Sequence, residues 1–475
     1  MIAMAPKPHR FNMSDMISLI SPVDGSLYAE RPTAQNGDIE ATLNAAWLAQ
    51  KKWASTDIAT RRQLIYAMLD VIDPQRDVIA EELAWQMGRP VRYGGGEVNG
   101  FIERATHMAD IAETALSHIE PDAKAGFTRH IERRPLGVVF VIAAWNYPYL
   151  TAVNSIVPAL MAGNSVILKH SAQTMLVAER LAAAFAQAGM PDGLFSVLHL
   201  NHAQSAEVIG DKRIAHVNFT GSVAGGHAVQ HAARDRFIGL GLELGGKDPA
   251  YVRADANIQA TAEALVDGSF FNSGQSCCGI ERIYADHRVV DDLVAAMRST
   301  AADYKLGNPL DFETTLGPMV RPSAASFVQQ QINQAVGAGA SALIDAADFP
   351  AHDPASAYMA PQLLVNVTHD MAVMREESFG PVVGIMSVES DAQAIELMND
   401  SVYGLTACVW TADLQAAQTI GQQVRTGTFF MNRCDYLDPG LAWTGIGDTG
   451  RGTSLSQIGY EQLTRPMSFH LKHEL

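Results

Sequence analysis

Residues 138–144 read Val-Val-Phe-Val-Ile-Ala-Ala, a continuous apolar run that predicts a strand buried on both faces of a parallel sheet. An apolar-periodic segment follows and predicts a helix over 149–161, and the next apolar run predicts a strand over 165–169. The alternation continues through strand 195–200, strand 216–220, helix 223–234 and strand 237–244, with helix 174–188 before them. Strands separated by helices of this length predict βαβ units and a doubly wound α/β sheet.

The regions on either side of this alternation extend the pattern. A second alternating stretch runs from about residue 249 to about residue 440, so a boundary between two α/β units is predicted near Gly245-Gly246. Upstream, residues 38–118 carry apolar positions at helical spacing. We expect the run Gly94-Gly95-Gly96 to break this helical region before a further helix over 97–119.

Composition narrows the class of protein. The chain has 475 residues, which favours more than one domain, and its 48 % hydrophobic and 18 % charged content is typical of globular proteins. The net charge of −17 disfavours binding to nucleic acid or to anionic membranes. Neither a secretory signal nor an apolar run of membrane-spanning length is evident. Four cysteines without paired spacing predict no zinc site and no disulfide scaffold, which favours a reducing, cytoplasmic setting.

A cysteine and a glutamate carry the strongest chemical signal. Cys277 follows Asn-Ser-Gly-Gln-Ser, a polar turn on which a thiol is available for nucleophilic attack. Glu243 lies in Glu-Leu-Gly-Gly-Lys, where small neighbours allow a carboxylate to approach the thiol or a water beside it. The pair suits covalent capture of a carbonyl followed by hydrolysis. The predicted domain boundary separates them, so an interdomain cleft is expected.

Five separated motifs then resemble the aldehyde dehydrogenase superfamily, and they occur in that family's order. They are Ala-Trp-Asn-Tyr-Pro (144–148), Phe-Thr-Gly-Ser (219–222), Glu-Leu-Gly-Gly-Lys (243–247), the segment around Cys277, and Glu-Glu-Ser-Phe-Gly-Pro (376–381). The resemblance spans most of the chain. It implies an α/β fold with a doubly wound dinucleotide-binding domain, an α/β catalytic domain and a small β oligomerisation element.

The resemblance also implies how the chain divides into domains. The dinucleotide-binding domain would comprise 1–118 and 137–245, and the catalytic domain 246–461. The oligomerisation element would combine 119–136 with 462–475. A homodimer or homotetramer is expected.

By resemblance, Cys277 is the catalytic nucleophile that forms a thiohemiacetal and then a thioester. Asn146 would stabilise the oxyanion together with the backbone N–H of Cys277. Glu243 would activate the water that hydrolyses the thioester, which requires a pKa raised by burial. Cys278 is either a packing residue or the partner of Cys277 in a redox-sensitive pair.

The dinucleotide site is predicted at the turn Gly221-Ser222, which follows a strand and opens a helix whose N-terminal N–H groups suit a pyrophosphate. The motif at 445–450 matches G-x-G-x-x-G in letters only and is interpreted as a loop, because no clear strand precedes it and no helix follows. The resemblance implies cofactor contacts from Trp145, Lys169, Gly221, Ser222, Leu244, Glu377 and Phe379.

The choice between NAD and NADP stays open, with NAD slightly favoured. Relatives that prefer NAD often carry a glutamate where Ala172 stands, and its loss removes repulsion against a 2′-phosphate. His170 replaces a common proline and is expected to add partial positive charge there.

Substrate identity is predicted only by class. By analogy, Tyr147, Tyr436 and Trp443 line the entrance, where aromatic rings and neighbouring aspartates suit a cationic aminoaldehyde. A semialdehyde is also possible. Two further hypotheses are a coenzyme-A-acylating semialdehyde dehydrogenase and a catalytically silent protein on the same fold. No metal is expected.

Overall fold

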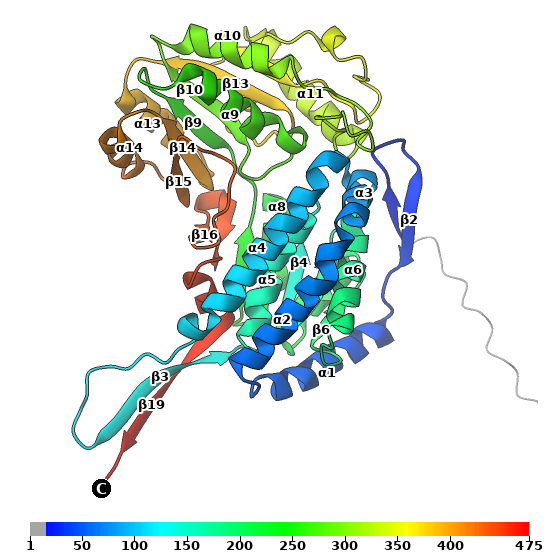
Figure 1. Ribbon diagram of the computed structural model, residues 1–475, viewed down its shortest axis with the longest axis vertical. Helices are drawn as coiled ribbons and strands as arrows, with labels where there is room; N and C mark the ends of the chain where they lie inside the picture. Colours follow the sequence, from blue (N-terminus) through cyan, green and yellow to red (C-terminus); the bar gives the residue numbers. More distant parts are fainter. Residues whose placement is uncertain (1–15, 475) are drawn as a thin grey trace, which may run out of the picture.

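The computed structural model describes residues 16–474. Residues 1–15 and 475, which the predicted dinucleotide-binding domain and oligomerisation element include, lie outside the described residues. Figure 1 shows two α/β lobes, one above the other, and a two-stranded ribbon that projects from the lower lobe. Both lobes contain a mainly parallel sheet, so the predicted α/β class is confirmed.

The sheet of the lower lobe has six strands in the order β17-β8-β7-β4-β5-β6. Its strands are β4 (Val138–Ala143), β5 (Ser165–His170), β6 (Phe195–Val197), β7 (Ile214–Thr220), β8 (Gly239–Glu243) and β17 (Gly450–Arg451). All neighbours are parallel except β17, which pairs antiparallel with β8. The sheet thus contains every strand predicted between 138 and 244, with the last residues of the 195–200 prediction lying outside β6.

Strand β4 shows why its run is apolar throughout. All six of its residues are buried, because successive side chains point to opposite faces and helices cover both. Val139, Val141 and Ala143 belong to the core on one face, whereas Val138 and Phe140 belong to the core on the other.

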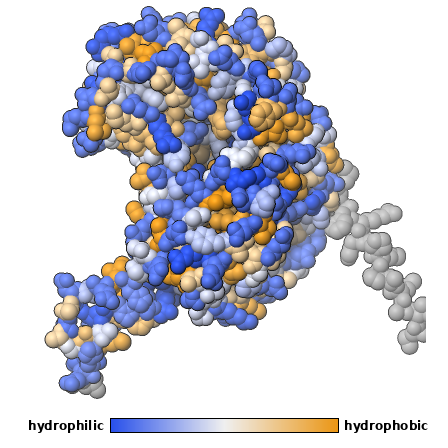
Figure 2. Space-filling model, in the orientation of Figure 1, coloured by the Kyte–Doolittle hydropathy of each residue, from blue (hydrophilic) through white to orange (hydrophobic). Residues whose placement is uncertain are grey.

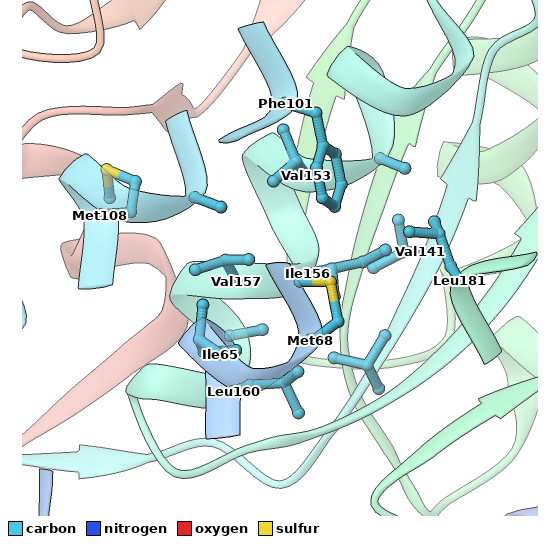
Figure 3. Close-up of a cluster of buried hydrophobic side chains, with 14 of the residues drawn as sticks. Ile65, Met68, Phe101, Met108, Val141, Val153, Ile156, Val157, Leu160 and Leu181 are labelled. Carbon is cyan, nitrogen blue, oxygen red and sulfur yellow. The ribbon is translucent and has the colours of Figure 1, made fainter. Parts of the chain in front are cut away.

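Helices fill both sides of this sheet. They are α1 (Asn36–Trp53), α2 (Ile58–Ile72), α3 (Arg76–Met87), α4 (Val91–Ala115), α5 (Pro148–Met161), α6 (Met175–Gln187), α7 (His202–Gly210) and α8 (Val223–Ala232). Figure 3 shows α2, α4, α5 and α6 meeting β4 through Met68, Phe101, Ile156, Leu181 and Val141. On the other face, α1, α7 and α8 contribute Ile39, Val208 and Val229.

The predicted break at Gly94-Gly95-Gly96 is wrong, because α4 runs without interruption from Val91 to Ala115. At Gly94, a Cβ would lie 2.3 Å from the Cβ of Ala80 on α3. The glycine therefore lets two helices pack closely instead of ending one of them. At Gly95 and Gly96 nothing lies within 4 Å of such an added Cβ. The helix tolerates these two glycines because the rest of α4 is held by its packing.

The upper lobe contains a seven-stranded sheet in the order β11-β12-β13-β10-β9-β14-β15. Its strands are β9 (Asp248–Val252), β10 (Ile280–Asp286), β11 (Ser341–Ala342), β12 (Gln362–Val365), β13 (Val382–Val388), β14 (Thr406–Trp410) and β15 (Thr428–Met431). Only the β11–β12 pair is antiparallel. The accompanying helices are α9 (Ile258–Phe270), α10 (Val290–Ala301), α11 (Pro322–Gly337), α12 (Ala372–Arg375), α13 (Asp391–Asn399) and α14 (Leu414–Gly421).

The chain crosses between the lobes at the predicted place. Strand β8 ends at Glu243 in one sheet and β9 begins at Asp248 in the other, with Gly245-Gly246 between them. Figure 2 shows the surface indented where the two lobes meet.

The projecting ribbon is formed by β3 (Phe127–Pro135) and β19 (Thr464–Lys472), which pair antiparallel along their full length. It joins the two segments predicted as an oligomerisation element, and Figure 1 shows it standing clear of both lobes. The remaining strands are β1 (Met16–Ile20), β2 (Leu27–Pro32), β16 (Trp443–Thr444) and β18 (Thr453–Ser454). Between residues 16 and 474, every helix is too short or too polar to cross a lipid bilayer.

Candidate active site

Cys277 lies just beyond a tight left-handed turn. After α9, the short helix η4 (Phe271–Gly274) places Asn272, Ser273 and Gly274 at φ values of 54°, 57° and 67°. Such conformations are rare outside glycine, and here side-chain bonds hold them: Asn272 Nδ2 donates to the Gln275 carbonyl at 3.2 Å, and Ser273 Oγ to the Gly317 carbonyl at 2.7 Å. Cys277 itself stays partly exposed, whereas Cys278 is buried.

Asn146 lies in the loop between β4 and α5, and its backbone is anchored from two sides. Its carbonyl accepts a hydrogen bond from Arg89 Nη2 at 2.6 Å and one from Asn272 Nδ2 at 3.2 Å. Arg89 is in turn paired with buried Glu97 of α4. The Asn146 side-chain nitrogen donates to the Gln275 carbonyl at 3.2 Å, two residues before Cys277. The amide is thereby fixed beside the thiol-bearing loop.

Glu243 ends β8, and two hydroxyl groups hold its carboxylate. Ser454 Oγ donates to one oxygen, and Thr220 Oγ1 donates to the other at 3.3 Å. Burial raises the pKa of Glu243, while the Ser454 hydroxyl, the charge of Arg104 and the Thr220 hydroxyl oppose that shift. A carboxylate with a raised pKa is a better acceptor for a proton from water near neutral pH.

These three residues meet at one cavity of about 270 Å³ between the lobes. The cavity is lined by Arg104, Asn146, Tyr147, Leu150, Thr151, Asn154, Thr220, Glu243, Asp267, Phe271, Ser276, Cys277, Cys278, Asp435, Leu437 and Trp443. The cavity thus brings together a thiol, a fixed amide donor and a partly buried carboxylate, which are the groups needed for covalent attack on a carbonyl, oxyanion stabilisation and hydrolysis.

A second, water-sized cavity of about 10 Å³ lies next to Glu243. Ser155, Asn218, Ser454 and Gln462 line it with other residues. The Asn218 amide nitrogen and the Gln462 amide oxygen are buried there without a hydrogen-bond partner in the part of the chain that the structure describes. Polar walls and this size suit one ordered water.

Hydrogen bonds hold the Cys278 side chain in the cavity wall. Its thiol donates to Asp435 Oδ1 at 2.9 Å, and Ser276 Oγ donates to the same oxygen at 3.0 Å. The adjacent Cys277 and burial raise the pKa of Cys278 well above its usual range. Burial also raises the pKa of Asp435. Cys278 is therefore held as a protonated thiol in the cavity wall.

Of the three aromatic residues predicted at the entrance, Tyr147 and Trp443 line the cavity. One face of Tyr147 is covered by the Arg89 guanidinium, 4.5 Å from the ring centre. Tyr436 is not among the lining residues of the described chain: Arg433 lies 3.5 Å from its ring centre, and its hydroxyl donates to Glu103 at 3.4 Å.

The predicted phosphate turn has the expected local structure. Ser222 caps α8, accepting a hydrogen bond from Gly225 N at 3.2 Å, and the N-terminal turn of this helix is open to solvent. Gly226 lets Leu244 approach the same turn, because a Cβ there would lie 2.7 Å from a Leu244 methyl carbon. The sequence at 445–450 forms a single 3₁₀ turn and a two-residue strand, and opens no α-helix, as predicted.

Lys169 is the penultimate residue of β5 and is half-buried, and burial lowers its pKa. No residue within 16–474 forms a salt bridge or hydrogen bond with its ammonium group, so it has donors free for a ligand. The expectation that His170 adds positive charge is wrong. Burial lowers the pKa of His170 to about 4, and its ring bonds the Pro148 carbonyl at 3.1 Å and the Thr174 hydroxyl at 3.0 Å.

The 376–381 motif reaches the same cleft from the upper lobe. Glu377 accepts a hydrogen bond from Gly246 N at 3.0 Å, and burial raises the pKa of its carboxyl group to about 7. Phe379 has a φ of 50°, and its ring meets Trp145 edge-on with centres 5.6 Å apart. Glu281 fixes this turn by accepting from Phe379 N at 2.9 Å. The lobes thus approach each other through Glu377 and through the Trp145–Phe379 contact.

Five residues that hold the site residues in place or add charge to the cavity were not predicted from the sequence: Thr220, Ser454, Arg89, Glu97 and Arg104. Arg104 lies on α4, and its charge acts on Cys277, Cys278 and Glu243. Arginine and glutamate on a helix ordinarily indicate a solvated face, and only their apolar neighbours at helical spacing signalled burial.

Comparison with known proteins identifies the family of the chain. The family model described as the aldehyde dehydrogenase family matches residues 11–469. The succinate semialdehyde dehydrogenase [NAD(P)+] Sad of Escherichia coli K12 is 31 % identical over 443 residues, covering 93 % of this chain and 95 % of that protein. The 4-trimethylaminobutyraldehyde dehydrogenase of Rattus norvegicus is 30 % identical, covering 93 % and 90 %.

Among solved structures, the NAD-dependent aldehyde dehydrogenase of Sinorhizobium meliloti superposes with a TM-score of 0.93 at 28 % identity, covering 98 % of this chain and 93 % of that chain. The chain therefore belongs to the aldehyde dehydrogenase family and is an oxidoreductase that acts on aldehydes. The family and the fold predicted from the sequence are confirmed.

Proposed function

We propose that this member of the aldehyde dehydrogenase family oxidises an aldehyde to the carboxylate with NAD(P)⁺ and water, through an acyl-cysteine intermediate. The observation that carries the proposal is the convergence of Cys277, Asn146 and Glu243 on one cavity at the junction of the lobes.

In the first half-reaction, the Cys277 thiolate attacks the aldehyde carbon to form a thiohemiacetal. The carbonyl oxygen becomes an oxyanion, which Asn146 Nδ2 and the backbone N–H of Cys277 stabilise. Because Arg89 and Asn272 already hold the Asn146 backbone, the amide needs little rearrangement. A nicotinamide cofactor held by Glu377, Trp145 and Phe379 would supply the acceptor for the hydride that leaves the substrate carbon. A thioester on Cys277 remains.

In the second half-reaction, Glu243 accepts a proton from a water molecule, which then attacks the thioester carbon. The C–S bond breaks, Cys277 regains its thiolate, and the carboxylate product leaves. The burial that raises the pKa of Glu243 suits this role, and the bonds from Ser454 and Thr220 orient the carboxylate.

The dinucleotide would lie over the carboxyl edge of the six-stranded sheet, as in other open α/β sheets. The open N-terminus of α8 at Gly221-Ser222 suits the pyrophosphate, and the unpartnered Lys169 suits the adenosine ribose. Glu377 and the Trp145–Phe379 pair would hold the nicotinamide half. Leu244 completes the wall near α8. Ala172 leaves room for NADP as well as NAD.

The domain assignment stays part of the proposal. Residues 1–118 and 137–245 would form the dinucleotide-binding domain, 246–461 the catalytic domain, and 119–136 with 462–475 the oligomerisation element. Pairing of β3 with β19 supports the last of these, because a ribbon that stands clear of the monomer has edges and faces for a second subunit. We propose a cytoplasmic homodimer or homotetramer.

Replacement of Glu243 by Gln tests the hydrolytic mechanism. Glu243→Gln keeps the first-turnover burst of reduced cofactor and slows steady-state turnover, since only deacylation needs the base. Cys277→Ala abolishes both phases. Equal loss of burst and steady state in folded Glu243→Gln would contradict a deacylation role. Turnover only when coenzyme A is supplied would favour the acylating alternative, and full activity of Cys277→Ala would refute the mechanism.

A further inference from the structure

Four arginines of the described chain are buried, and Arg104 differs from the other three. These four are Arg61, Arg89, Arg104 and Arg282. The guanidinium groups of Arg61, Arg89 and Arg282 each donate at least three hydrogen bonds to protein acceptors. Arg104 donates one, to Asn154 Oδ1 at 3.2 Å, and forms no salt bridge with any residue from 16 to 474. A charge buried to this extent is costly without partners.

The unpaired donors of Arg104 belong to the substrate cavity. Arg104, on α4, and Asn154, on α5, both line it, although they are only 8 % and 4 % exposed. Asn154 accepts from Arg104 through its amide oxygen, so its amide nitrogen is left as a second donor, with no acceptor in the described chain. Arg104 and Asn154 thus present unpaired donors from two neighbouring helices to the same space.

The nearby carboxylates are engaged elsewhere. Glu97 is paired with Arg89 and accepts from Tyr149 N at 2.9 Å. Glu243 is held by its two hydroxyl donors. Asp435 accepts hydrogen bonds from Ser276 and Cys278. None of them forms a salt bridge with Arg104, so its positive charge has no direct counterpart in the wall.

Asp267 is the one acid of the cavity wall whose residue is exposed, and burial of its carboxyl group still raises its pKa. Its carboxyl group accepts a hydrogen bond from the Tyr304 hydroxyl at 3.5 Å, while Arg104 acts from a buried position beside Cys277 and Glu243. A cationic aminoaldehyde bound beside Arg104 would meet a buried cation that has no salt-bridge partner in the cavity wall. An anionic substrate would supply the missing partner.

We infer that Arg104 and Asn154 form a carboxylate-binding subsite, and that the substrate is a semialdehyde whose carboxylate lies a few carbon atoms from the aldehyde. The inference rests on the proposed function, because it places the aldehyde carbon at Cys277. A guanidinium binds a carboxylate through two parallel N–H donors, and the Asn154 amide adds a third donor.

Steady-state kinetics with three aldehydes of similar length test the subsite: 4-oxobutanoate (anionic), its methyl ester (neutral) and 4-trimethylaminobutyraldehyde (cationic). The wild-type enzyme has the highest kcat/KM for 4-oxobutanoate. Arg104→Met keeps the aliphatic stem and removes the charge, so kcat/KM falls about 100-fold for 4-oxobutanoate and less than about threefold for the ester, as a charge-assisted pair predicts. Arg104→Lys restores part of the preference.

Arg92→Met is the matched control. Arg92 lies on the same helix but is exposed and packs over Tyr93 and Phe312, so its loss changes the net charge equally and leaves the preference intact. Wild-type enzyme provides a second readout that needs no variant: succinate competes with the aldehyde, and succinamide at the same concentration does not.

The outcomes separate the subsite from the proposed function. Oxidation of the ester at least as efficient as that of 4-oxobutanoate by wild-type enzyme, or equal loss on all substrates in Arg104→Met, overturns the subsite and leaves the oxidation mechanism in place. Absence of reduced cofactor with every aldehyde overturns the proposed function itself. If Arg104→Met does not fold, the wild-type preference and the succinate competition decide the matter.

Discussion

Gly94 and Gly96 lie on the same helix, α4, and substitution by alanine should change stability in opposite directions. At Gly94, an added Cβ would lie 2.3 Å from the Cβ and 2.5 Å from the Cα of Ala80 on α3. At Gly96, which is exposed, nothing lies within 4 Å of the added atom. The two substitutions are chemically identical, so their difference isolates the contact between the helices.

Two terms set the magnitude. Glycine in a helix interior is about 1 kcal/mol less favourable than alanine, so Gly96→Ala should stabilise the protein by about 1 kcal/mol. Carbon atoms pack best at about 3.5–4.0 Å, so the contact at Gly94 is more than about 1 Å too short. Ala80 contributes a helix backbone, not a flexible side chain, and overpacking of this kind costs about 3 kcal/mol. Subtracting the propensity gain leaves a net loss of about 2 kcal/mol for Gly94→Ala.

Urea-induced unfolding, followed by tryptophan fluorescence, measures both variants against the parent. We expect the midpoint to rise for Gly96→Ala and to fall for Gly94→Ala, with unchanged slopes. Stabilisation of both variants by similar amounts would refute the argument, because it would mean that α3 and α4 separate without cost and that Gly94 is not needed for their packing.

Two further predictions concern the active site. Ser454→Ala removes a hydroxyl group that lowers the pKa of Glu243, so the pKa of Glu243 rises and less of its carboxylate is ionised at a given pH. We therefore expect the acid limb of the steady-state kcat profile to move to higher pH, while the burst of reduced cofactor is retained. An acid limb that stays in place would contradict this expectation. Lys169→Met removes the unpartnered ammonium group near the end of β5, so we expect the KM for the dinucleotide, measured at saturating aldehyde, to rise about tenfold or more. An unchanged KM would argue against a role of Lys169 in binding the dinucleotide.

Much of the fold follows from local sequence. Strands buried on both faces leave unbroken apolar runs such as 138–144, and the helices between them follow from periodicity alone. Gly94 was misinterpreted because a glycine that permits close packing and a glycine that ends a helix look the same in the sequence. Only the position of Ala80 on a neighbouring helix distinguishes them.

The residues of the candidate site could be predicted from the sequence where they lie in a motif. They could not be predicted where their role depends on burial and on the charges around them. Cys277, Asn146 and Glu243 lie in family motifs, and all three line the cavity. His170 was expected to carry charge because histidine titrates near neutral pH, yet enclosure by the protein keeps its ring neutral. Arg104 has no motif at all. Its significance is that it is buried with a single hydrogen bond, which no sequence pattern expresses.

The position of Arg104 also connects substrate binding to the later hydrolysis. Its positive charge lowers the pKa of Glu243, in opposition to the effect of burial. A substrate carboxylate bound to Arg104 would offset that charge, so the pKa of Glu243 would rise further and Glu243 would become a stronger base once the semialdehyde is in place. A neutral aldehyde would leave Arg104 uncompensated and Glu243 more acidic. The same buried arginine would then select the substrate and adjust the base that releases its product, which gives a chemical reason for keeping an unpaired cation in the cavity.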